Sequence, residues 1–98
     1  MSATPDYTLR PARPDDADTI AAFNIAIAWE TEHLRLDPPT VLAGVRAVLA
    51  DPNKGLYFVA ADARDDRVVS QLMITHEWSD WRNGDLWWIQ SVYTHPDH

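Results

Sequence analysis

The chain has 98 residues, a length that fits one domain over residues 1–98 and is too short for two. Its net charge is −7, with eight basic residues against fifteen acidic ones. This charge has the wrong sign for a protein that binds nucleic acid or an anionic membrane, so we expect neither as a partner. It has no cysteine, so disulfides and thiolate chemistry are excluded, and no apolar run approaches the ~20 residues of a membrane span. We expect a cytoplasmic protein, because the first residues show no secretory signal.

The first half of the chain predicts a short strand followed by two helices. Residues 7–10 alternate and stop at Pro11, which is typical of an edge strand. Pro14 and the carboxylates after it indicate a helix start, although Arg13 is a poor N-cap, and this helix is expected to end within residues 29–34. Asp37 is a good N-cap for the second helix. The predicted buried stripes are Ala17, Ile20, Phe23, Asn24 and Ile27 in the first helix, and Val41, Leu42, Val45, Val48 and Leu49 in the second.

The second half predicts three strands, over residues 56–61, 68–78 and 86–94, with a hairpin turn at Asn83-Gly84. The order β-α-α-β-β-β argues for an α+β fold with a mainly antiparallel sheet and two helices on one face. Residues 56–61 and 87–93 are apolar on both strand faces, whereas two helices can cover only one face of a sheet. The bare face predicts a further segment or a partner.

Two stretches carry a family resemblance: "YTLRPARPDDAD" near the start and "IQSVYTHPDH" at the end. With the element order, they resemble the N-terminal half of the GNAT superfamily, the acetyl-CoA-dependent N-acyltransferases. The resemblance covers residues 7–98. In the family, the second stretch runs into an Arg/Gln-x-x-Gly-x-Gly/Ala loop that holds the cofactor pyrophosphate. Residue 98 lies one position before that loop would begin, and Ser70 stands where family members often carry Gly.

The resemblance implies a partial GNAT domain that uses acetyl-CoA as co-substrate, and it places Val92, Tyr93 and Thr94 at the cofactor. In the family the last strand bulges here, its free main-chain groups pair with the pantetheine arm, and one N–H polarises the thioester carbonyl. An ordinary strand end is the alternative. The implied reaction is direct attack by a primary amine of a small molecule or peptide. The family's leaving-group acid is a Tyr beyond the last strand, so we expect little or no transferase activity from residues 1–98 alone.

Glu77 is the first candidate for the general base. An alkylammonium with a pKa near ~10 must lose a proton before it attacks, and partial burial beside Ile74 and Trp78 would raise the pKa of Glu77 toward a useful value. The alternative is a solvated carboxylate at the mouth of a hairpin. His76 points to the opposite strand face, so we do not pair it with Glu77.

Five further residues are candidates for substrate binding: Trp88, Gln90, Trp78, Glu30 and His33. The two tryptophans belong to segment 77–88, which holds four of the five tryptophans and forms either an aromatic wall for the acceptor or a packing or dimer contact. Gln90, a polar residue in an apolar run, must find partners in the substrate or in the adjoining strand. Glu30, Glu32 and His33 fall in the connection between the helices, which is either a lining of the acceptor pocket, as in the family, or a solvated loop.

Two further possibilities are a metal site and a role other than that of an enzyme. His95 and His98 give no fixed metal-binding geometry, so no metal is expected. The alternative to an enzyme is a non-catalytic half-domain that self-associates through its last strand and bare sheet face, and a homodimer is expected in either case.

Overall fold

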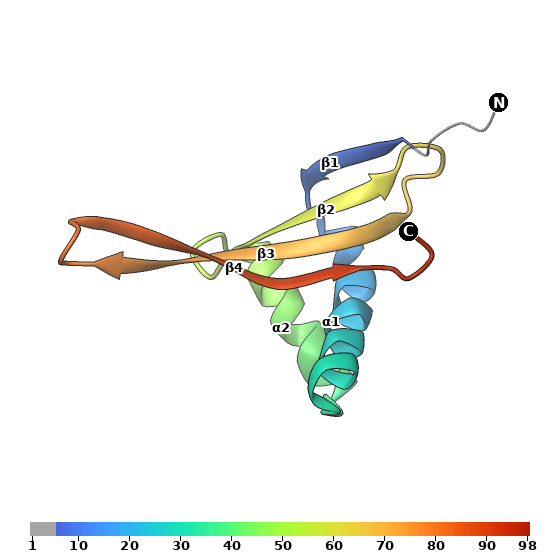
Figure 1. The fold of residues 1–98 in the computed structure, drawn as a ribbon, viewed down its shortest axis with the longest axis horizontal. Coiled ribbons are helices and arrows are strands. Elements are labelled where there is room, and N and C mark those ends of the chain that lie inside the picture. Colours follow the sequence, from blue (N-terminus) through green and yellow to red (C-terminus); the bar gives the residue numbers. More distant parts are fainter. Residues whose placement is uncertain (1–5) are drawn as a thin grey trace.

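The computed structural model describes residues 6–98 as an antiparallel four-stranded sheet with two helices on one face (Figure 1). The strand order is β1-β2-β3-β4, so sequential strands are neighbours. The predicted β-α-α-β-β-β order and the α+β class are confirmed. The elements are β1 (Tyr7–Pro11), a 3-10 turn η1 (Pro14–Asp16), α1 (Ala17–Glu32), α2 (Pro38–Ala50), β2 (Leu56–Asp62), β3 (Val68–Ser79) and β4 (Gly84–Thr94).

Both helix starts depend on an aspartate. Asp37 caps α2 as predicted, because its carboxylate accepts from the Thr40 backbone N–H at 3.3 Å. The weak start at Arg13 is stabilised by Asp16, which accepts from the Arg13 backbone N–H at 2.7 Å and from Arg10 Nη1 at 2.7 Å. One 3-10 turn therefore precedes α1, where the sequence predicted the α-helix itself.

The core lies between the two helices and the inner face of the sheet. Both predicted stripes face it, but Val45 is the single fully buried residue of the second stripe, whose other members are partly buried at its edge. Asn24 and Ile27 in the first stripe are also only half-buried. The buried cluster consists of Ala17, Ile20, Ala21, Phe23, Val45, Tyr57, Val59 and Val68.

Beyond Ile74, the strands β3 and β4 continue as a two-stranded arm that projects past the helices (Figure 1). We call residues 75–88 the arm. Its four tryptophans have exposed fractions of 51% to 94%, and two of them contact residues of the same hairpin, Trp87 the His76 ring and Trp88 the Glu77 carboxylate. They are Trp78, Trp81, Trp87 and Trp88.

The sheet face opposite the helices is bare within residues 6–98, as the sequence predicted. Leu9, Ile89 and Val92 are exposed there, and the half-buried Phe58 and Leu72 line a shallow groove of about 500 Å³. Across the same described range, no helix is long and apolar enough to cross a bilayer. Nor does that range hold three His, Cys, Asp or Glu side chains grouped so that they could bind a metal ion.

Candidate functional site

The last strand carries a β-bulge at Ser91 and Val92. Gln71 pairs with Tyr93 and Met73 pairs with Gln90, so two residues of β4 stand opposite Leu72 alone. Ser91 has φ 52°, in the left-handed region. β4 is also the last strand of the sheet, and its outer edge has no strand partner among the described residues.

Two hydrogen bonds show which main-chain groups after the bulge remain free. The Tyr93 carbonyl accepts from Ser70 Oγ at 3.0 Å, and the His95 N–H donates to the Val69 carbonyl at 2.7 Å, so both groups face β3. Because the peptide groups of a strand alternate in direction, those of Val92 and Thr94 face the open edge. Of the three residues predicted at the cofactor, the main chains of Val92 and Thr94 are thus available, and the Tyr93 carbonyl is directed inward.

A buried polar network lies under the bulge. Tyr57 Oη accepts from Asn24 Nδ2 at 3.1 Å, and Asn24 Oδ1 accepts from Gln71 Nε2 at 2.7 Å. The same Gln71 nitrogen donates to the Ser91 carbonyl at 3.4 Å. Burial raises the pKa of Tyr57. Sequence reasoning missed Gln71, although a single amide within the apolar run "VVSQLMI" is a signal that could have identified it.

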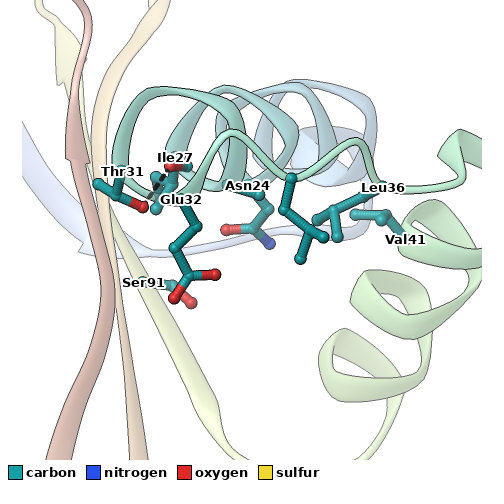
Figure 2. A pocket seen from close by; sticks show the side chains of 9 residues that line it. Asn24, Ile27, Thr31, Glu32, Leu36, Val41 and Ser91 are labelled. Atoms are coloured by element: carbon teal, nitrogen blue, oxygen red, sulfur yellow. Dashed lines mark hydrogen bonds between the residues drawn. The ribbon is translucent and has the colours of Figure 1, made fainter.

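A pocket of about 380 Å³ opens beside the bulge, between the C-terminal half of α1, the following loop and α2 (Figure 2). Its polar lining includes Asn24, Thr31, Glu32 and Ser91, and its apolar lining comes from the helices and the loop. Figure 2 shows the Glu32 carboxylate extending across the pocket toward Ser91. The pocket thus combines a carboxylate, an apolar wall and the bulged strand.

The other acidic and imidazole candidates near α1 lie outside this lining. The helix extends to Glu32, so Glu30 belongs to its last turn and not to the connection. Burial and the nearby Glu30 carboxylate raise the pKa of Tyr93. His33 caps α1 with φ 51°, and its ring packs edge-to-face on Trp29 at 5.4 Å.

The candidates on the arm and next to it are arranged differently from the prediction. Glu77 is exposed, so the expected partial burial is wrong, and its Oε2 accepts from Trp88 Nε1 at 3.2 Å. Gln90 is exposed as well, and it finds its partner in the adjoining strand by donating to Thr75 Oγ1 at 2.6 Å.

Strand geometry separates Glu77 from the bulge and from Trp78. Glu77 lies five residues along β3 from Leu72 (77 − 72), which is roughly 16 Å at ~3.3 Å per residue. Trp78 points to the sheet face opposite Glu77, since successive side chains alternate. Glu77 and Trp88 are therefore brought together, but neither Glu77 nor Trp78 is brought to the pocket.

Comparisons with known proteins agree with this geometry. Neither a protein-family model nor a curated protein matches the sequence. Among solved structures, a "possible acetyltransferase" from Clostridium difficile 630 is 50% identical, with a TM-score of 0.87 over 94% of this chain and 59% of its own. A "predicted acetyltransferase with acetyl-CoA" from Clostridium acetobutylicum is 15% identical (TM-score 0.71, 94% of this chain, 62% of its own). A ribosomal-protein-alanine N-acetyltransferase from Brucella melitensis biovar Abortus 2308 is 14% identical (TM-score 0.70, 95% and 59%).

These matches agree in extent as well as in fold. The chain spans about 60% of the length of each of these proteins while nearly all of its own residues are aligned. The two matches below 20% identity establish the fold, and the C. difficile protein adds similarity in sequence. The resemblance to the GNAT superfamily is thereby confirmed, and the chain has the β-α-α-β-β-β fold of half a GNAT acetyltransferase.

Proposed function

We propose that this chain is the thioester-binding half of an N-acetyltransferase that transfers an acetyl group from acetyl-CoA to a primary amine. The observation that carries the proposal is the bulge at Ser91 and Val92 on the open edge of β4. The outward-facing groups of Val92 and Thr94 can pair with the amides of a pantetheine arm as an added strand would. An N–H of this segment can then polarise the thioester carbonyl.

The pocket beside the bulge is our proposed acceptor site. Glu32 supplies a negative charge that attracts an ammonium group, and the apolar wall of Ile27, Leu36 and Val41 can hold the carbon chain next to it. The amine must be neutral when it attacks the thioester, and the CoA thiolate then leaves without a covalent enzyme intermediate. The proposal covers small-molecule and peptide amines alike.

Proton removal has two candidates in this proposal. Glu77, with its partner Trp88, stands roughly 16 Å along the strand from the bulge, so it could take the proton only through a chain of waters. Glu32 lies in the pocket itself. Trp78, Gln90, Glu30 and His33 would contact only those parts of the acceptor that extend beyond the pocket.

An NMR titration of the 98-residue chain tests the proposal. S-acetyl-pantetheine, which lacks the nucleotide, should shift the amide signals of Val92 and Thr94 at about millimolar concentration. Adenosine 3′,5′-bisphosphate, which lacks the pantetheine arm, should leave them unchanged. An unchanged β4 edge with both compounds would contradict the proposal. We also propose that the 98-residue chain alone transfers little acetyl group, and tight 1:1 binding of acetyl-CoA in calorimetry would contradict that part.

The bare sheet face favours a second candidate, a half-domain that pairs with a copy of itself. Leu9, Ile89 and Val92 are at least 60% exposed on that face, which is apolar area that a second copy would cover. Light scattering after size exclusion should then give twice the mass of 11.1 kDa. A clean monomer at high concentration would count against the homodimer.

A further inference from the structure

Two neighbouring side chains of β3 reach the bulge from opposite faces of the sheet. Ser70 Oγ donates to the Tyr93 carbonyl at 3.0 Å and lies 3.0 Å from Thr94 Oγ1. Gln71 Nε2 donates to the Ser91 carbonyl at 3.4 Å. Consecutive side chains of a strand point to opposite faces, so these contacts hold the β4 backbone on both sides of Val92.

The orientation of the Gln71 amide is fixed from below by α1. Its NH₂ group has two hydrogens, and two acceptors use them: Asn24 Oδ1 at 2.7 Å and the Ser91 carbonyl. Asn24 is held in turn by its hydrogen bond to Tyr57. Gln71 is 2% exposed, and its Oε1 has no hydrogen-bond partner among the described residues. The orientation of the amide therefore satisfies both N–H donors and leaves the carbonyl oxygen unpaired.

The backbone at the bulge needs such restraint. Ser91 has φ 52°, and a residue other than Gly keeps a left-handed conformation only where its surroundings impose it. Without the donor from Gln71, the bulge could slide along β4 or straighten. Either change would alter which peptide groups face the open edge, because that direction alternates from residue to residue.

We propose that Ser70 and Gln71 are positioning residues that fix the bulge and thereby direct the peptide groups of Val92 and Thr94 to the open edge. This inference rests on the proposed function for its chemical meaning, since those groups are the ones that would meet the thioester arm. Ser70 also contacts the Thr94 hydroxyl, but no hydrogen bond joins either side chain to the main chain of Val92 or Thr94 among the described residues. Both act through the carbonyls of Ser91 and Tyr93, which they hold toward β3.

Amide hydrogen exchange and the three-bond H–N–Hα coupling of Ser91 test the inference in the 98-residue chain without any ligand. Gln71→Met removes both amide donors at similar length, and Ser70→Ala removes the hydroxyl. Each change should speed exchange at Tyr93 and His95 about fivefold to tenfold relative to β2 amides, as expected for one lost hydrogen bond. Gln71→Met should also move the Ser91 coupling toward that of an extended residue.

Two matched variants act as controls. Ser70→Thr keeps a hydroxyl at the same place and should stay within about twofold of the wild-type exchange rates. Thr75→Val removes the hydrogen bond from the Gln90 side chain without affecting the contacts to the Ser91 and Tyr93 carbonyls, and it should leave the Ser91 coupling unchanged. Equal acceleration of exchange at all amides would overturn the inference, because the side chains would then contribute only to global stability. No change at Tyr93, His95 and Ser91 would overturn it as well, because the side chains would then not restrain the bulge.

The S-acetyl-pantetheine titration separates this inference from the proposed function. If the wild-type chain binds, both variants should weaken the shifts at Val92 and Thr94 by about fivefold or more in Kd. If the wild-type chain fails to bind, the proposed function is contradicted. The exchange measurements then decide the positioning role by themselves.

Discussion

Asp16 joins the first strand to the first helix, and we expect replacing this buried side chain to destabilise the fold strongly. Its side chain is 10% exposed and accepts from Arg10 Nη1 at 2.7 Å, from Arg10 Nη2 at 3.2 Å and from the Arg13 backbone N–H at 2.7 Å. Replacing it leaves the Arg10 guanidinium, itself 14% exposed, without its closest partner. An uncompensated charge of this kind typically costs about 3 to 5 kcal/mol.

We therefore expect Asp16→Ala to lower the free energy of unfolding by about 3 kcal/mol, the lower end of that range, because Asp66 lies 3.6 Å from Arg10 Nε and compensates in part. Asp16→Asn keeps one oxygen acceptor and should lose roughly half as much. Urea unfolding at pH 7 measures both values. Asp15→Asn is the matched control, since its exposed carboxylate makes no ion pair within residues 6–98, and it should change stability by less than ~0.5 kcal/mol.

The pH dependence provides an independent check. Burial acts to raise the pKa of Asp16, but the hydrogen bonds from Arg10 and the Arg13 N–H outweigh it and lower that pKa below its ordinary value. A carboxyl group with a depressed pKa in the folded state contributes stability above its unfolded pKa of ~3.9, and this contribution is lost as the pH falls below that value. Wild type should thus lose more stability than Asp16→Ala between about pH 5 and pH 2. A loss below ~1 kcal/mol for Asp16→Ala at pH 7, with parallel pH profiles, would refute the reasoning.

Three other changes follow from the structure. Asp37→Ala removes the cap of α2 and should cost about 1 kcal/mol in urea unfolding, whereas Asp37→Ser, another capping residue, should cost little. Gly55→Ala should cost about 1 to 3 kcal/mol, because φ is 157° and an added Cβ would lie 3.2 Å from the Ile74 carbonyl; Gly44→Ala, in α2 with nothing within 4 Å, should stabilise the chain instead. In a form of the protein that transfers acetyl groups, Glu32→Gln should raise the KM for a cationic amine about twofold to fivefold, as for one exposed charge pair, and an unchanged KM would remove Glu32 from the acceptor site.

Local patterns predicted most of the elements because their causes are local. Pro11, Asp37 and the Asn83-Gly84 turn act within a few residues, and the α1 stripe repeats at the helical period. The bare sheet face also followed from the sequence, since two helices cannot cover both sides of strands that are apolar on both. The resemblance to half a GNAT fold rests on this element order, on the stretch "YTLRPARPDDAD" and on the stretch around the bulge.

The burial of individual polar residues depended on distant contacts and was misjudged. Glu77 lies near Ile74 and Trp78, and Gln90 lies in an apolar run, which suggested burial for both. Glu77 is instead on the arm that projects beyond the helices, Gln90 lies just past it, and both are exposed. Gln71 drew no attention in the sequence and lies almost fully buried, where Asn24 from α1 reaches it. No window of neighbouring residues contains that information, because the partners are 47 residues apart.

The sequence by itself determined the order of elements, the Asp37 cap of α2 and the uncovered apolar face, because each depends on neighbouring residues or on the hydrophobic period. Only the tertiary structure decided the direction of the peptide groups at β4, since that direction depends on the register of β3 against β4 and on a bulge of one residue. It also decided which carboxylate reaches the pocket, because the end of α1 brings Glu32 there and the arm carries Glu77 away.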